Sequence, residues 1–162
     1  MKTLSKIIGS IIIVSTLLHC AGDKDTAGDA GHEQSIFPKG QLGPATNFTG
    51  NAYNFELVSD DSTYNTLVGN VYFETSARSN WHVHPSGQIL IVLDGEGYHQ
   101  LEGQPKQTMR KGDVIKCPPN VRHWHGATEN SSLTQMYILP KTENGIVTWL
   151  EPVTDEQYKS TN

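Results

Sequence analysis

Two His-x-His pairs, His82-Val83-His84 and His123-Trp124-His125, constrain this 162-residue chain more than any other feature of its sequence. Side chains at positions i and i+2 of a β-strand share a face, so each pair directs two imidazoles to the same side of a sheet. Unpaired imidazoles in an apolar interior carry a desolvation cost, which argues against two such pairs as ordinary core residues. The pattern predicts one metal site built from two strands that are distant in the sequence.

Further site residues follow from neighbouring positions. Pro85-Ser86-Gly87 has the composition of a tight turn, and such a turn would return the chain and place the Gln88 amide oxygen near the first pair. His125 shares a face with His123, so it can act as a general base or acid beside the metal, or as a labile fifth ligand or outer hydrogen-bond partner. Gln135 can orient a substrate or hydrogen-bond to the backbone.

The region after residue 47 alternates short β-branched and aromatic segments with turn residues, which is typical of an all-β sandwich or barrel. Thr154-Asp155-Glu156-Gln157 has the pattern of a capping box and predicts one short C-terminal helix. The expected strands are 52–58, 66–75, 81–84, 88–93, 97–101, 114–117, 123–125, 133–139 and 146–150.

Three other residues are expected to lie outside the site. His99 alternates with Tyr98 and Gln100 and is expected on the surface, whereas Cys117 ends an apolar strand and is expected to be a buried, inert thiol. Trp124 lies between two inward-facing histidines, so it should point to the opposite side of the sheet and pack there.

Charge and cysteine content exclude several classes of protein. Twelve Lys and Arg against 17 Asp and Glu give a formal charge of −5, which argues against nucleic acid as a partner and favours a small molecule or another protein. The two cysteines, Cys20 and Cys117, form no C-x-x-C motif, so neither a disulfide framework nor a zinc ribbon is expected. The length fits one domain.

The N-terminus has the pattern of an export signal. Lys2 and Lys6 precede an apolar run over 7–18, which is shorter than the roughly 20 residues that span a bilayer. Cys20 follows this run in a context that resembles the lipobox of bacterial lipoproteins; the alternative is an ordinary secretory signal. The resemblance implies a lipoprotein signal peptide over 1–19 and a lipid on Cys20 that anchors the exported protein to a membrane, in the periplasm or at the cell surface.

The segment that follows Cys20 is rich in Gly, Ala and Asp and has no large apolar side chain, so it is expected to be a flexible tether over 20–35. The folded domain is expected to cover 36–162.

Two spaced motifs resemble those of the cupin superfamily, in its small single-domain form. The first is His82-Val83-His84, three residues, Gln88, six residues and Gly95; the second runs from Gly112 through Pro118 to His123. The resemblance implies a double-stranded β-helix, or jelly-roll barrel, over 36–162. Cupins commonly pair by strand exchange, so it also implies a homodimer.

The stretches WHVHPSGQILIV and HWHGAT are similar to those of the manganese-dependent hydroxynitrile lyases among the small cupins. This similarity implies that one divalent metal is bound by His82, His84, Gln88 and His123, with His125 beside it. Manganese is the expected metal, and iron, nickel or zinc also suits three nitrogens and one oxygen. These lyases carry a pocket histidine where this chain has Gln135.

The implied ligands are all neutral, so the ion would keep its full charge and polarise a bound hydroxyl or carbonyl oxygen strongly. The sequence therefore favours a lyase-like enzyme that acts on a small hydroxy or carbonyl compound, with cyanohydrin cleavage and synthesis as the named reaction. Two alternatives remain open: a cupin dioxygenase that uses ferrous iron, and a module that binds a small ligand or a metal without catalysis.

Overall fold

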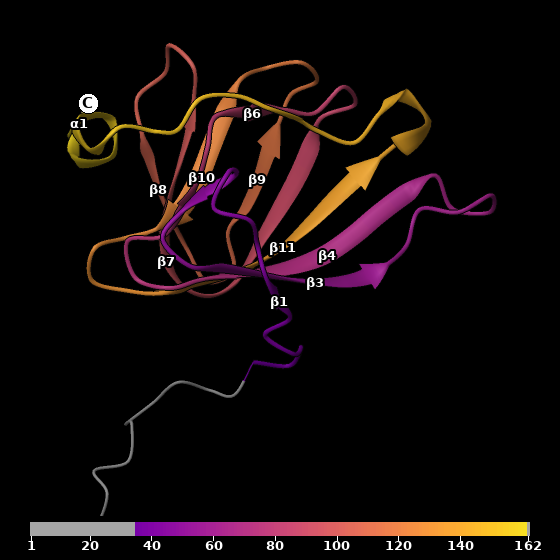
Figure 1. Ribbon diagram of the computed structural model, residues 1–162, viewed down its shortest axis with the longest axis horizontal. Coiled ribbons are helices and arrows are strands. Elements are labelled where there is room, and N and C mark those ends of the chain that lie inside the picture. The colour runs from indigo at the N-terminus through magenta and orange to yellow at the C-terminus, as the bar shows by residue number, and fades with distance from the viewer. Residues whose placement is uncertain (1–34, 162) are drawn as a thin grey trace, which may run out of the picture. The chain divides into compact units, whose positions relative to one another are not determined.

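The computed structural model describes residues 35–161 (Figure 1). The predicted signal peptide over 1–19, the lipid on Cys20 and nearly all of the predicted tether lie outside the described residues. Within 35–161, no helix is long and apolar enough to cross a bilayer.

The regular secondary structure of the described chain is almost entirely β, as predicted. The strands expected over 52–58 and 114–117 are present with those bounds, and the two expected over 88–93 and 97–101 form one long strand. The elements are β1 (Gln41–Leu42), β2 (Phe48–Thr49), β3 (Ala52–Val58), β4 (Thr66–Phe73), β5 (Arg78–Ser79), β6 (His82–Val83), β7 (Gln88–Leu101), β8 (Gln107–Arg110), β9 (Val114–Cys117), β10 (His123–Ala127), β11 (Leu133–Pro140), η1 (Thr142–Asn144), β12 (Thr148–Trp149) and α1 (Asp155–Lys159).

The strands form a curled antiparallel sheet in the order β1-β3-β4-β11-β7-β10-β5-β2, with β6, β8, β9 and β12 paired beside this path. Figure 1 shows the result as two layers, with β3, β4 and β11 in one and β8 and β10 in the other. This arrangement confirms the predicted cupin-type β-fold.

Strand β7 belongs to both layers because it bends in the middle. Its first half pairs with β11 and β9, and its second half pairs with β10 and β8. Gly95 lies at the change of partner with a φ of +79°, and a Cβ there would lie 1.9 Å from the carbonyl oxygen of Ser132. Only glycine fits this conformation and this close approach, so Gly95 permits the bend.

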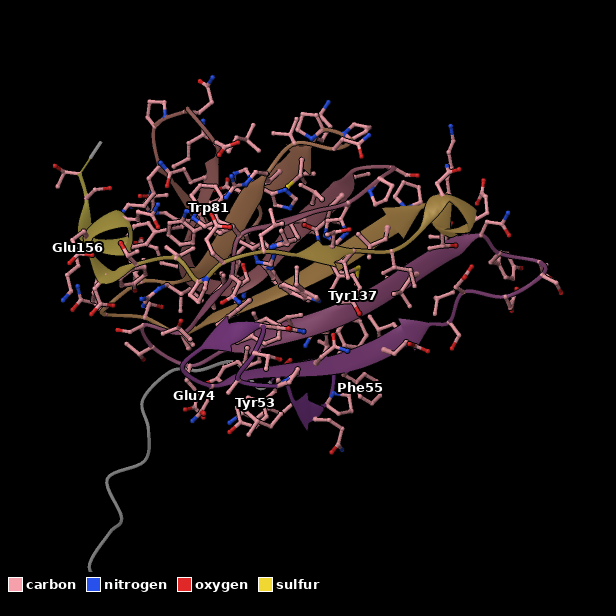
Figure 2. All side chains as sticks on the ribbon, turned by 45° about the horizontal axis from the view of Figure 1, so that its top comes forward. Tyr53, Phe55, Glu74, Trp81, Tyr137 and Glu156 are labelled. Carbon is pink, nitrogen blue, oxygen red and sulfur yellow. The ribbon has the colours of Figure 1, made fainter. Side chains whose placement is uncertain are left out.

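Two apolar clusters hold the layers together. The first lies between the sheets and centres on Phe73, Val92 and Leu133. The second packs Trp81 and Trp124 against Val153 and Tyr158 of the C-terminal segment, and Figure 2 shows Trp81 beside that segment. Trp124 therefore packs on the side of β10 opposite to the histidines, as predicted.

The C-terminal segment is fixed by polar contacts as well. Arg78, which is buried, donates hydrogen bonds to the carbonyl oxygen of Val153 and to the carboxylate of Asp155. The predicted capping box is present, because the Thr154 side chain accepts from the Gln157 amide and the Gln157 side chain accepts from the Thr154 amide. The short helix α1 begins at this cap.

Candidate metal centre

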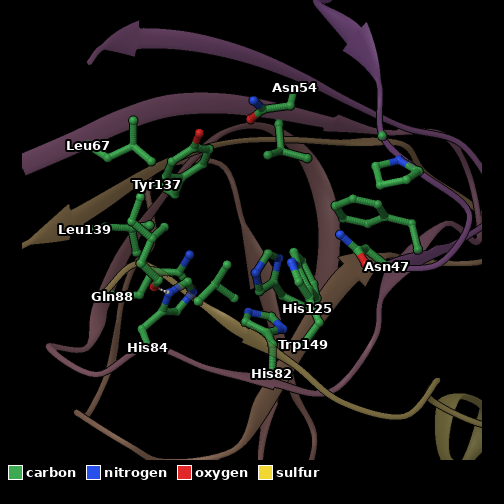
Figure 3. Close-up of a pocket in the computed structure, with 16 residues that line it drawn as sticks. Asn47, Asn54, Leu67, His82, His84, Gln88, His125, Tyr137, Leu139 and Trp149 are labelled. Carbon is green, nitrogen blue, oxygen red and sulfur yellow. Dashed lines mark hydrogen bonds between the residues drawn. The ribbon is translucent and has the colours of Figure 1, made fainter. Parts of the chain in front are cut away.

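The fold brings the two His-x-His pairs together. His82 on β6 is in register with His123 on β10, and their ring centroids are 4.3 Å apart. The His84 ring lies 5.1 Å from that of His82 and 5.5 Å from that of His123. Strands separated by about 40 residues in the chain thus supply imidazoles to a single centre (Figure 3).

Hydrogen bonds to the main chain set the tautomer of these three rings. Nδ1 of His82 lies 2.9 Å from the carbonyl oxygen of Asn80, and Nδ1 of His123 lies 2.9 Å from that of Val121. Nδ1 of His84 lies 2.6 Å from the carbonyl oxygen of Ile146. A carbonyl oxygen only accepts, so each Nδ1 carries the hydrogen and each Nε2 keeps a free lone pair. Metal-binding histidines are oriented in this way.

Two observations indicate that a cation fits between these rings. The Gln88 Oε1 atom lies 3.1 Å from Nε2 of His123, and both atoms are acceptors in the tautomer described above. Nε2 of His84 is buried and has no hydrogen-bond partner within 35–161. Converging acceptors without a donor are unfavourable unless a positive charge lies among them. The three imidazoles and Gln88 therefore suit a divalent metal ion.

Burial keeps the imidazoles neutral, which metal ligation requires. Desolvation, followed by repulsion from neighbouring histidines, holds the pKa of His82 well below its usual value. Desolvation also lowers the pKa of His84 and lowers the pKa of His123 to about 4. At neutral pH the site offers lone pairs without first losing protons.

His125 also lies at this centre. The ring nitrogens of His82, His123 and His125 include three candidate ligand atoms within 4.8 Å of one another. However, Nδ1 of His125 lies 2.6 Å from the amide nitrogen of Gln135. An amide nitrogen only donates, so Nδ1 accepts and the hydrogen of the neutral ring resides on Nε2. In this arrangement His125 is a hydrogen-bond donor beside the centre rather than a fifth ligand.

Gln135 is fully buried. Its side-chain amide contacts another side chain and not the backbone, which was one of the two predicted partners. Its side chain reaches His125, and its amide oxygen has no hydrogen-bond partner within the described part of the chain. The structure thus places Gln135 against His125, where it determines which ring nitrogen carries the proton.

The expected surface position of His99 is wrong. His99 is only 3% exposed, and its Nε2 lies 3.3 Å from Sγ of Cys117. Tyr98 and Gln100 occupy the other face of β7, where the C-terminal segment and Trp124 cover them, so their polarity does not mark a solvent-exposed strand. Cys117 is buried as predicted, and burial raises the pKa of its thiol to about 12.

A cavity of about 260 Å³ opens above the histidines. His82, His84, Gln88 and His125 form one part of its wall, and most of the remaining wall is apolar (Figure 3). Sequence reasoning missed several lining residues, although Tyr137 could have been found because it shares a strand face with Gln135. The missed residues include Phe48, Asn54, Leu67, Val71, Tyr137, Leu139, Ile146 and Trp149.

A curled antiparallel sheet with two His-x-His strands around one buried centre is the arrangement of a cupin, and this chain belongs to the cupin family. A family model described as "Cupin domain" matches residues 69–138. The chain is 39% identical to an (R)-mandelonitrile lyase of Granulicella tundricola over 117 residues, which are 72% of this chain and 89% of that protein.

Solved structures agree with this assignment. A cupin-like protein from Thermotoga maritima superposes with a TM-score of 0.77 at 44% sequence identity, over 78% of this chain and 96% of that chain. The DMSP lyase DddQ from Ruegeria pomeroyi superposes with a TM-score of 0.57 at 17% identity, over 72% of this chain and 64% of that chain. At 17% identity, the similarity to DddQ shows a shared fold and nothing more.

Proposed function

We propose that this cupin is a divalent-metal-dependent lyase that cleaves and forms the carbon–carbon bond of a small cyanohydrin. The observation that carries the proposal is the 39% identity to an (R)-mandelonitrile lyase, most of whose length is matched by this chain. The site is consistent with that chemistry, because neutral metal-ligating groups converge at the wall of a largely apolar cavity.

The proposed ligands are His82, His84, His123 and Gln88. The three rings present Nε2 lone pairs, and the amide of Gln88 presents its oxygen beside that of His123. A divalent ion held there, manganese by preference, would act as a Lewis acid on the oxygen of a hydroxyl or carbonyl group. Iron, nickel and zinc fit the same donor set.

His125 is the proposed proton-bearing group. It lines the cavity and its Nδ1 is occupied by Gln135, so its Nε2–H bond remains for a bound molecule. When a cyanohydrin is cleaved, the hydroxyl proton passes to solvent water and the electron pair of the carbon–carbon bond leaves with cyanide as the carbonyl forms. Cyanide then takes up one proton, so that an aldehyde and hydrogen cyanide are released. A donor at Nε2 stabilises the negative charge that develops on the leaving cyanide.

The proposal is tested with the full-length protein loaded with manganese. Conversion of mandelonitrile to benzaldehyde, followed by absorbance, is expected in the loaded protein and not in the chelated protein. No conversion under either condition would overturn the lyase proposal. Oxygen consumption on addition of substrate would instead indicate a dioxygenase, and a retained ligand without turnover would indicate a binding module.

Residues outside the site support two further proposals. We propose that the protein is exported and lipid-modified at Cys20, which predicts a mature form that lacks 1–19 and partitions into detergent.

We also propose a homodimer, since several outward side chains of β7 and β11 are half-buried apolar groups, among them Ile89, Ile91, Met136 and Ile138. A monomeric mass in solution would contradict the dimer.

A further inference from the structure

The cavity has a second polar location besides the metal centre. Tyr137 and Asn54 both line it, and in Figure 3 the Tyr137 hydroxyl points toward Asn54, on the side away from His82. Most of the remaining wall is formed by apolar side chains, among them Leu67, Val71 and Leu139. A ligand that fills the cavity therefore meets polar groups at two separate places and apolar groups over most of the remaining wall.

Glycine at position 69 makes room for the Tyr137 ring. Gly69 on β4 is in register with Tyr137 on β11, and both side-chain positions are on the inner face. A Cβ at position 69 would lie 2.3 Å from the Tyr137 hydroxyl oxygen and 2.4 Å from the ring carbon that bears it. The ring thus lies flat against the glycine, and any larger residue would push it into the cavity.

The Tyr137 hydroxyl has a hydrogen to donate. Burial raises the pKa of Tyr137, and the contact with Asn54 offsets only part of that rise, so the hydroxyl keeps its hydrogen at neutral pH. The O–H bond is then available to an acceptor on a bound molecule. A carboxylate on the ligand would lose its hydration in this largely apolar cavity, so an uncharged group is favoured there.

Size limits the ligand as well. Cavities that hold drug-sized molecules have volumes of roughly 300–1,000 Å³, and this cavity has about 260 Å³. The occupant is therefore a compact molecule, such as one substituted aromatic ring.

We propose that the substrate is a small aromatic aldehyde or its cyanohydrin with a second, uncharged oxygen at the far end of the ring, and that Tyr137 is the residue that selects it. The proposal rests on the proposed function, since the aldehyde oxygen is placed at the metal centre. Tyr137 binds the remote oxygen, Asn54 orients the Tyr137 hydroxyl, and Gly69 provides the space for the ring.

The test compares binding of three aldehydes to the manganese-loaded, full-length protein by calorimetry. The probes are benzaldehyde, 4-(hydroxymethyl)benzaldehyde and 4-carboxybenzaldehyde. One neutral hydrogen bond corresponds to roughly a 2- to 10-fold change in Kd, so the hydroxymethyl compound is expected to bind more tightly than benzaldehyde by that factor. The carboxylate is expected to bind more weakly than benzaldehyde.

Tyr137→Phe is the matched variant, because it keeps the ring against Gly69 and removes only the hydroxyl. It is expected to abolish the preference for the hydroxymethyl compound while leaving the Kd of benzaldehyde and the metal content unchanged. Gly69→Ala is expected to weaken the binding of both neutral aldehydes, because the displaced Tyr137 ring enters the cavity.

The outcomes separate this inference from the proposed function. Equal binding of the two neutral aldehydes, or an undiminished preference in Tyr137→Phe, would overturn the role of Tyr137 and leave the lyase proposal standing. Binding of neither aldehyde, together with no conversion of mandelonitrile, would overturn both.

Discussion

The amide nitrogen of Gln135 lies 2.6 Å from Nδ1 of His125, and both side chains are buried. This contact gives His125 the opposite tautomer to His82, His84 and His123, whose Nδ1 atoms face carbonyl oxygens. One centre therefore contains three rings that offer lone pairs and one ring that offers a proton. The hydrogen-bond partner of each Nδ1 atom decides which of these two roles a ring has.

Gln135→Glu tests that division. A carboxylate at position 135 accepts from Nδ1 of His125, so the ring hydrogen should move from Nε2 to Nδ1. We expect the ¹⁵N chemical shifts of the His125 ring nitrogens to exchange their order and the lyase activity to fall roughly 10- to 100-fold, the usual effect of changing the partner of a site histidine. Gln135→Leu serves as the comparison, because it removes the contact without supplying an acceptor. Unchanged nitrogen shifts in Gln135→Glu would refute the tautomer assignment.

Gln88→Glu should strengthen metal retention. The substitution replaces a neutral oxygen ligand with a charged one at the same position, and the added attraction should lower the metal Kd roughly tenfold or more. The same negative charge reduces the positive charge available to the substrate, so turnover should fall while metal content rises. Competition with a chelator measures the first effect, and a Kd equal to that of the unaltered protein would contradict a ligand role for Gln88.

The metal-free protein should lose stability in mild acid. Burial lowers the pKa of His99 and of His123 to about 4, whereas an unfolded histidine titrates near ~6.5. Above pH ~6.5 these two histidines are neutral in the folded and in the unfolded chain. Below that pH they bind protons in the unfolded chain but stay neutral in the folded chain. The free energy of unfolding should therefore fall by about 1.4 kcal/mol per pH unit for each such histidine as the pH drops toward 4. Denaturant titrations that show no fall between pH 7 and pH 5 would contradict this expectation.

Removal of the helix cap should cost modest stability without affecting the site. The Thr154 side chain accepts from the Gln157 amide at the start of α1, and Thr154→Ala leaves that amide without its partner. Loss of such a cap costs about 1 kcal/mol. Thermal unfolding should shift accordingly while metal content stays the same, and Thr154→Ser is the control that should restore stability.

Alternation along a strand explains what the sequence could predict. The rule that residues i and i+2 share a face identified both histidine pairs and the outward position of Trp124, because each depends only on local strand geometry. The motif spacing around His84 and Gln88 likewise depends on one short turn. The strand β8 gave no signal, because Met109 is the only large apolar residue within Gln107–Arg110.

Features that depend on distant segments could not be predicted in this way. His99 is buried because Cys117 of β9 and His123 of β10, both distant in the sequence, lie against its face of β7. The contact between Gln135 and His125 depends on how β11 and β10 lie on either side of β7. The Tyr137 ring lies where it does because β4 presents a glycine opposite to it.

Metal stoichiometry in single histidine variants tests the central claim most directly. The full-length protein, reconstituted with manganese and freed of excess ion, should contain one metal per chain by elemental analysis. His123→Ala should contain almost none, because it removes the ring that lies between His82 and Gln88, whereas His125→Ala should keep a full complement. One metal per chain in His123→Ala would contradict the account.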